Sequence, residues 1–134
     1  MNWDQYVDLQ GSVLSSLDKS AIENFLAQLR NLQNSGNTLW VGGNGGSSST
    51  ASHAAADLTK TVSQTGAKPV ITLSLSEALS LTTASANDLD FETSLANSIR
   101  LMAKPGDAVL DLGCGKGFLL YELQLLIDRK STRL

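Results

Sequence analysis

A glycine-rich segment between an apolar run and a hydroxyl-rich run constrains this chain most strongly. Residues 38–41 (Thr-Leu-Trp-Val) predict a short buried strand, and residues 42–46 (Gly-Gly-Asn-Gly-Gly) follow it directly. Residues 47–62, rich in alanine and serine, then predict a helix that opens on hydroxyl side chains. Glycines let the backbone turn tightly and approach a ligand closely. A strand, a glycine loop and a helix in this order predict an anion-binding turn.

The candidate phosphate-binding residues are those of the loop and the first helical turn: Asn44, Gly45, Gly46, Ser47 and Ser48. Free backbone amides at the helix start and hydroxyls, without a lysine, suit a sugar phosphate better than a nucleoside triphosphate. The Walker pattern G-x-x-x-x-G-K-[ST] is absent here. A solvated glycine turn with an ordinary serine cap is the alternative interpretation.

His53 and Asp57 are the candidate chemical pair on the predicted helix. Residues four apart lie on one helical face, so the two side chains are expected to be neighbours below the loop. The spacing alone leaves three interpretations open: two metal ligands, an acid/base unit or a surface hydrogen bond. The surface hydrogen bond is the commonest of the three for an isolated H-x-x-x-D.

The rest of the pattern predicts an α/β fold. Further strands are expected at 69–73 and 108–112, and helices at 76–86, 88–102 and 117–127, with a turn at 105–107. Strands and helices that alternate in this way indicate a parallel sheet covered by helices. Two amphipathic helices precede the first strand. The second is expected to open with a capping box at residues 20–23 and to stop at Gly36.

Both amino-terminal helices carry apolar stripes. The stripes are Trp3, Tyr6, Val7, Val13, Leu14 and Leu17, and then Ile22, Phe25, Leu26, Leu29 and Leu32. Packing in the core is the expected role of both stripes. A contact with another subunit is the alternative for the first.

Composition excludes several function classes. Hydrophobic residues make up 42% of the 134 residues, which is enough for a folded core. The net charge of −3 argues against a nucleic-acid partner and against a polybasic membrane surface. No apolar run approaches the roughly 20 residues that cross a bilayer. A single cysteine predicts no internal disulfide and fits the cytoplasm.

Several segments together resemble the phosphoheptose (sedoheptulose-7-phosphate) isomerase group of sugar-isomerase (SIS) domains. They are Gly43-Asn44-Gly45-Gly46-Ser47, Ala51-Ser52-His53, Asp57-Leu58, Leu73-Ser74-Leu75, Ala84 to Asp88 and Phe91-Glu92. The resemblance covers about residues 20–107. It implies a three-layer, flavodoxin-like parallel sheet, a homo-oligomer, and interconversion of aldose and ketose phosphates through an enediol.

The same resemblance assigns roles to individual residues. It implies that Ser47 holds the substrate or its phosphate, that Asp88 touches the sugar and that the His53 position can be a zinc ligand. Heptose isomerases carry glutamate where this chain has Asp57. The shorter side chain withdraws the carboxylate by about an ångström, and misplacement on that scale can cost about 100-fold in rate. A phosphosugar-binding module without catalysis is therefore the alternative to an isomerase.

The third strand runs into a different pattern. Residues 109–118 (Val-Leu-Asp-Leu-Gly-Cys-Gly-Lys-Gly-Phe) resemble the first motif of class I S-adenosylmethionine-dependent methyltransferases, within residues 104–127. The resemblance implies that cofactor at Asp111, Gly113, Gly115 and Gly117. The SIS group would instead have a serine- and threonine-rich phosphate loop at this place. A fragment of a bifunctional protein is thus a further alternative, and a plain glycine turn is another.

The expected organisation has three parts. Residues 1–107 form the amino-terminal part of an SIS domain, residues 108–128 the methyltransferase-like strand, loop and helix, and residues 129–134 a tail outside the fold. The leading hypothesis is a phosphosugar isomerase in which His53 and Asp57 supply the metal or proton-transfer site. We expect the SIS fold to be incomplete at its carboxyl end, so that this chain by itself is inactive.

Overall fold

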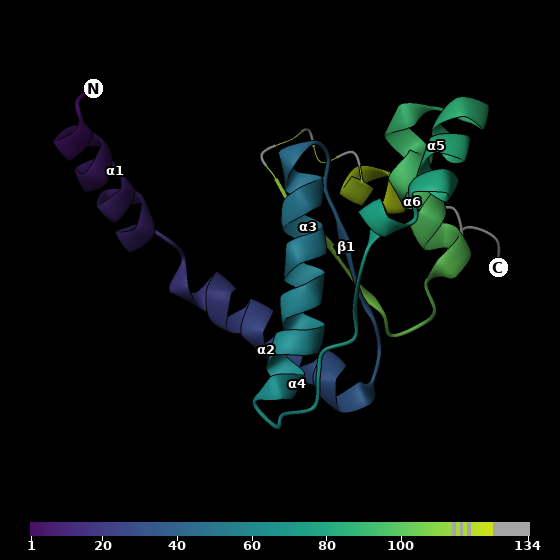
Figure 1. Cartoon of the computed structure of the whole chain (residues 1–134), viewed down its shortest axis with the longest axis horizontal. Coiled ribbons are helices and arrows are strands. Elements are labelled where there is room, and N and C mark those ends of the chain that lie inside the picture. The colour runs from purple at the N-terminus through teal and green to yellow at the C-terminus, as the bar shows by residue number, and fades with distance from the viewer. Residues whose placement is uncertain (114, 116, 118, 125–134) are drawn as a thin grey trace. The chain divides into compact units, whose positions relative to one another are not determined.

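The computed structural model describes residues 1–113, 115, 117 and 119–124 (Figure 1). The chain divides into two compact units, Met1–Arg30 and Asn31–Leu134. Within the described ranges no helix combines the length and apolar character that a membrane crossing requires. The tail expected at 129–134 and the end of the helix expected at 117–127 lie outside the described residues.

Helix α1 (Trp3–Ser15) begins at a reciprocal cap in the first unit. The Asn2 side chain accepts a hydrogen bond from the Gln5 amide, and the Gln5 side chain accepts one from the Asn2 amide, both at 2.9 Å. Helix α2 (Lys19–Ser35) begins one residue before the expected capping box. That expectation is wrong, because Asp18 caps the helix instead and accepts from the amides of Ser20 and Ala21.

The apolar stripe of α1 is exposed, so the expectation of core packing is wrong for this helix. No residue of α1 is buried, and Trp3 is 75% exposed while its ring stacks on that of Tyr6. On α2 the side chains of Ile22, Phe25 and Leu26 are also exposed, whereas Leu32 at the end of this stripe is buried, as expected. A unit of about thirty residues is too small to enclose two such stripes.

The second unit is built on a parallel sheet with strand order β2-β1-β3. Its strands are β1 (Leu39–Gly42), β2 (Thr72–Ser74) and β3 (Ala108–Asp111). The central strand β1 is buried along its whole length. Strand β2 begins later than the sequence predicts, because the Val70 amide bonds to the carbonyl of Leu58 on the preceding helix.

A long helical segment joins β1 to β2. It consists of α3 (Gly46–Ala56), a π-helical turn η1 (Asp57–Thr61) and α4 (Val62–Gln64). The expected helix at 47–62 is confirmed, but its π-helical turn was not expected. A short 3₁₀ turn η2 (Leu75–Glu77), α5 (Leu79–Asp88) and α6 (Phe91–Met102) connect β2 to β3. Gly36 ends α2 with a positive φ of 73°, as the sequence predicts.

Helices cover both faces of the sheet, as Figure 1 shows for α3 and the α5–α6 pair. Trp40 packs in one core cluster with Ile99 of α6 and Leu119. Because side chains alternate along a strand, the buried Leu39 and Val41 face away from that cluster. Helix α3 packs against β1 and β2. The three-layer α/β fold expected from the sequence is confirmed.

Asp107 ties the turn before β3 to the start of β1. Its carboxylate accepts hydrogen bonds from the Thr38 amide (2.9 Å), the Trp40 indole (3.0 Å) and the Lys104 amide (3.1 Å). Burial alone would raise the pKa of Asp107, but these hydrogen bonds and the Lys104 charge outweigh it and lower the pKa. The neighbouring Gly106 adopts a φ of 93°, which favours glycine at this turn.

Candidate functional site

The loops that follow β1 and β3 meet at one edge of the sheet. From β1 the chain passes to β2 on one side and then crosses back to β3 on the other. Ligands of open α/β sheets bind at such a switch point, beyond the carboxyl ends of the strands. The two loops are in close contact, because a Cβ atom on Gly113 would lie 2.8 Å from the Ser47 hydroxyl oxygen.

A cavity of about 420 Å³ lies at this switch point. Its lining is Asn44 and Ser47 after β1, Phe91, Glu92 and Leu95 of α6, and Asp111, Leu112, Gly113, Gly115, Gly117, Leu119 and Leu120 from β3 onward. This volume falls in the range of small-molecule sites. The structure therefore joins the glycine-serine loop and the methyltransferase-like loop into one site, which neither sequence pattern predicts alone.

Among the described residues that line the cavity, four have side chains that can form polar contacts: Asn44, Ser47, Glu92 and Asp111. Within the described part of the chain, none of the four side chains has a hydrogen-bond partner. Asp111 is partly buried, and this burial raises the pKa of its carboxyl group. The cavity thus presents hydroxyl, amide and carboxylate groups that are available to a ligand.

The amino terminus of α3 is less open than expected for an anion site. The Ser47 amide donates to the Asn44 carbonyl at 2.9 Å, and the Ser48 amide and hydroxyl both donate to the Gly45 carbonyl. The amides of Ser47 and Ser48 are therefore not free as expected, because the loop closes as a turn on itself. Gly45, with a φ of 53°, occupies the cap position without a side-chain cap. Of the five candidate phosphate residues, only Asn44 and Ser47 line the cavity.

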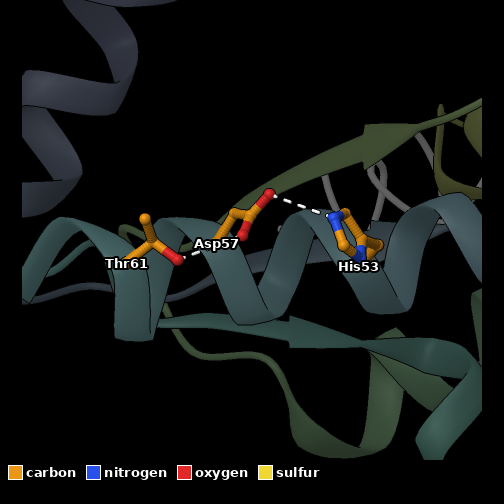
Figure 2. A network of polar contacts seen from close by, with 3 residues as sticks. All are labelled: His53, Asp57 and Thr61. Carbon is orange, nitrogen blue, oxygen red and sulfur yellow. Dashed lines mark hydrogen bonds and ion pairs between the residues drawn. The ribbon is translucent and has the colours of Figure 1, made fainter.

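His53 and Asp57 lie on one face of the α3–η1 helix, as expected (Figure 2). The His53 Nε2 and Asp57 Oδ2 atoms are 3.3 Å apart, and the Thr61 hydroxyl donates to Asp57 Oδ1 at 3.1 Å. Both members are exposed, with 81% of the His53 side chain accessible. Neither lines the cavity. Their catalytic and metal-binding roles remain predictions.

The pair falls short of a metal site by itself. A catalytic zinc ion takes at least three protein ligands. Across the described ranges, no group of three histidine, cysteine, aspartate or glutamate side chains is placed to hold a metal ion. His53 and Asp57 can therefore supply two ligands. The proton transfer proposed for this domain does not depend on a metal.

Asp88 lies at the end of α5 and outside the cavity. It is exposed, and its carboxylate accepts a hydrogen bond from Asn87 at 2.9 Å. Its proposed contact with the sugar remains a prediction. Sequence reasoning did not assign Glu92 to the site. The available signal was the segment Phe91-Glu92, which is one of those that resemble the phosphoheptose isomerase group.

Known proteins similar to this chain point to one group. No protein-family model matches the sequence. A protein from Thermoplasma volcanium named probable phosphoheptose isomerase is 30% identical over 112 residues, which is 84% of this chain and 57% of that protein. Its namesake from Thermoplasma acidophilum is 38% identical over 78 residues, 58% of this chain and 42% of that protein. The chain thus spans about half the length of these relatives.

The fold agrees with the sequence similarity. The solved structure of phosphoheptose isomerase GmhA from Neisseria gonorrhoeae superposes with a TM-score of 0.74 at 18% identity, over 95% of this chain and 66% of that one. Neither these relatives nor this structure supports the S-adenosylmethionine interpretation of Asp111, Gly113, Gly115 and Gly117. By sequence the chain is similar to proteins named probable phosphoheptose isomerase, and its fold is that of the solved GmhA structure.

Proposed function

We propose that this domain binds a phosphorylated sugar and serves the interconversion of a ketose phosphate and an aldose phosphate, such as sedoheptulose 7-phosphate and its aldose isomer. The observation that carries the proposal is the meeting of two strand-end loops at one cavity, in a chain similar to phosphoheptose isomerases. In this proposal Asn44 and Ser47 bind the phosphate end of the substrate, at the positive end of the α3 dipole, and Ser48 holds the turn beside them.

The chemistry assigned to the domain is a proton transfer between neighbouring carbons. A base removes a proton from C1 of the ketose while the carbonyl oxygen at C2 gains one. The resulting enediol then takes a proton at C2 while the hydroxyl on C1 loses one, which gives the aldose. His53 and Asp57 are the proposed acid/base unit, because an imidazole held by a carboxylate can accept and return a proton. Thr61 fixes the carboxylate that orients the imidazole.

We further propose that the domain acts as a homo-oligomer in the cytoplasm. The exposed apolar stripe of α1, which includes Val13 and Leu14, suits burial against a second copy. His53 does not line the cavity of its own chain. In the proposed homo-oligomer, this histidine lines the cavity of a second copy. The single cysteine is compatible with a reducing compartment. We also propose that Asp88 contacts the sugar and that His53 would be one ligand of a zinc ion.

Two measurements on the purified chain test the proposal. Calorimetric titration compares sedoheptulose 7-phosphate with sedoheptulose, and we expect binding that depends on the phosphate and weakens in Ser47→Ala. Incubation with sedoheptulose 7-phosphate in D2O then detects deuterium at C1, which reports enediol formation without net turnover. Glu23→Gln is the matched control, because Glu23 is exposed on α2.

The outcomes separate the candidate functions. Binding together with deuterium exchange that His53→Ala abolishes supports an isomerase. Binding without exchange indicates a phosphosugar-binding module. Equal affinity for sedoheptulose and its phosphate contradicts the proposal, since the loop at Ser47 would then contribute nothing to phosphate recognition.

A further inference from the structure

The described residues that line the cavity have an acidic character, which the proposed function does not explain. Glu92 and Asp111 both line the cavity, whereas none of its described lining residues is a lysine, arginine or histidine. A sugar phosphate carries about two negative charges at neutral pH. Like charges within a few ångströms repel, and more strongly where the surroundings are partly apolar, as Phe91 and Leu119 make them here.

Asp111 is the more constrained of the two carboxylates. It is the last residue of β3, so the backbone hydrogen bonds of the sheet fix its position, and Leu112 continues the pairing with β1 through the Gly42 carbonyl. Its side chain is partly buried, yet no described group donates to it. Burying a carboxylate without a partner costs folding free energy. A site that retains such a group has a carboxylate ready for a ligand's donors.

The loops after β1 and β3 are close enough for Asp111 to contact a ligand bound at Ser47. Gly113, two residues after Asp111, lies against the Ser47 side chain, because a Cβ atom on Gly113 would come within 3.4 Å of Ser47 Cβ. A ligand whose phosphate lies at Ser47 therefore has its carbon chain within the same cavity as Asp111. Sugar hydroxyls are neutral hydrogen-bond donors, and a carboxylate is a strong acceptor for them.

From this arrangement we propose that Asp111 determines specificity by accepting hydrogen bonds from the hydroxyl groups of the sugar, while its charge keeps the phosphate on the Ser47 side of the cavity. The inference rests on the proposed function and adds to it the direction in which the substrate lies. Asp111 then contacts the polyol part of the substrate, away from the phosphate. Glu92 contributes a second acceptor from the first turn of α6.

Calorimetric titration of the full chain with two probes tests this inference. The probes are sedoheptulose 7-phosphate and inorganic phosphate. Removing one hydrogen bond to a charged group should weaken sedoheptulose 7-phosphate about tenfold or more in Asp111→Ala. Inorganic phosphate should bind that variant as well as the unaltered chain, or more tightly. Asp111→Asn keeps an acceptor oxygen without the charge, so its loss for the sugar phosphate should be smaller.

Different failures identify different errors. If the unaltered chain binds sedoheptulose 7-phosphate and Asp111→Ala binds it equally well, the inference is wrong and the proposed function stands. If Asp111→Ala loses both probes in the same proportion, Asp111 supports the phosphate site and the inference is again wrong. If the unaltered chain binds neither probe, both fail together. S-adenosylmethionine binding that Asp111→Ala abolishes would also overturn it. Circular dichroism of each variant, beside Glu23→Gln, verifies the fold.

Discussion

Replacing Asp107 by alanine should destabilise the domain more than any other single acidic substitution outside the cavity. The carboxylate accepts three hydrogen bonds, from the Thr38 amide, the Trp40 indole and the Lys104 amide. Each bond to a charged acceptor contributes about 1.5–3 kcal/mol when fully buried. Because Asp107 is only partly buried, water replaces part of this contribution, and we expect a loss of about 2–4 kcal/mol. A small domain has about 5–15 kcal/mol in total.

Urea denaturation followed by tryptophan fluorescence measures this loss. Trp40 is 7% exposed and Trp3 is 75% exposed, so a Trp3→Phe background isolates the buried indole that bonds to Asp107. Asp107→Asn retains one acceptor oxygen and should lose about half as much. Asp8→Asn, an exposed acid on α1, is the matched control and should change little. A free energy of unfolding that changes no more in Asp107→Ala than in this control would refute the reasoning.

The pH dependence of the unfolding free energy tests the hydrogen-bonding role of Asp107 independently. The pKa of Asp107 in the folded chain lies below its ordinary value of about 3.9. A lowered pKa contributes stability that is present above the ordinary value and is lost as the pH falls through the folded-state value. Unfolding free energy should therefore fall below about pH 4 in the unaltered chain, and less steeply in Asp107→Asn. Equal slopes for the two proteins would contradict the hydrogen-bonding role.

Three other substitutions have expected outcomes. Asp111→Asn should raise the urea midpoint at pH 7, because burial raises the pKa of Asp111 and its charge opposes folding; the gain should vanish at pH 3, and a gain that persists there would contradict this. Gly113→Ala, at a φ of 130° and against Ser47, should lose about 1–3 kcal/mol and weaken sugar phosphate binding, whereas unaltered binding would show that the loops do not touch. Leu14→Glu should lower the sedimenting mass if α1 pairs with a second copy, and an unchanged mass would place that contact elsewhere.

Local signals in the sequence predicted the elements that position the site. Glycines after an apolar strand and hydroxyls before an alanine-rich run are sufficient for β1, its loop and α3, because each depends on neighbouring residues. The pairing of His53 with Asp57 follows from helical spacing in the same way. The alternation of expected strands and helices indicated a parallel sheet covered by helices, and the resemblance to the SIS group implied its flavodoxin-like form.

The features that were missed depend on contacts between distant segments. The meeting of Ser47 with Gly113 requires β3 to lie beside β1, which the alternation of strands and helices does not specify. The apolar stripe of α1 is exposed in this chain. An amphipathic pattern is the same for a helix that packs in its own core and for one that contacts another subunit, so the sequence could not distinguish these two roles. Asp18 took the capping role because its carboxylate reaches two amides of the first turn.

Amide chemical shifts on titration with sedoheptulose 7-phosphate test the central claim most directly, namely that the loops after β1 and β3 form one sugar phosphate site. We predict that the Ser47, Ser48, Leu112 and Gly113 amides shift together with one dissociation constant, and that unphosphorylated sedoheptulose shifts them less at equal concentration. Inorganic phosphate should move the Ser47 and Ser48 signals alone. Shifts confined to one loop, or two loops that respond with different affinities, would contradict the claim.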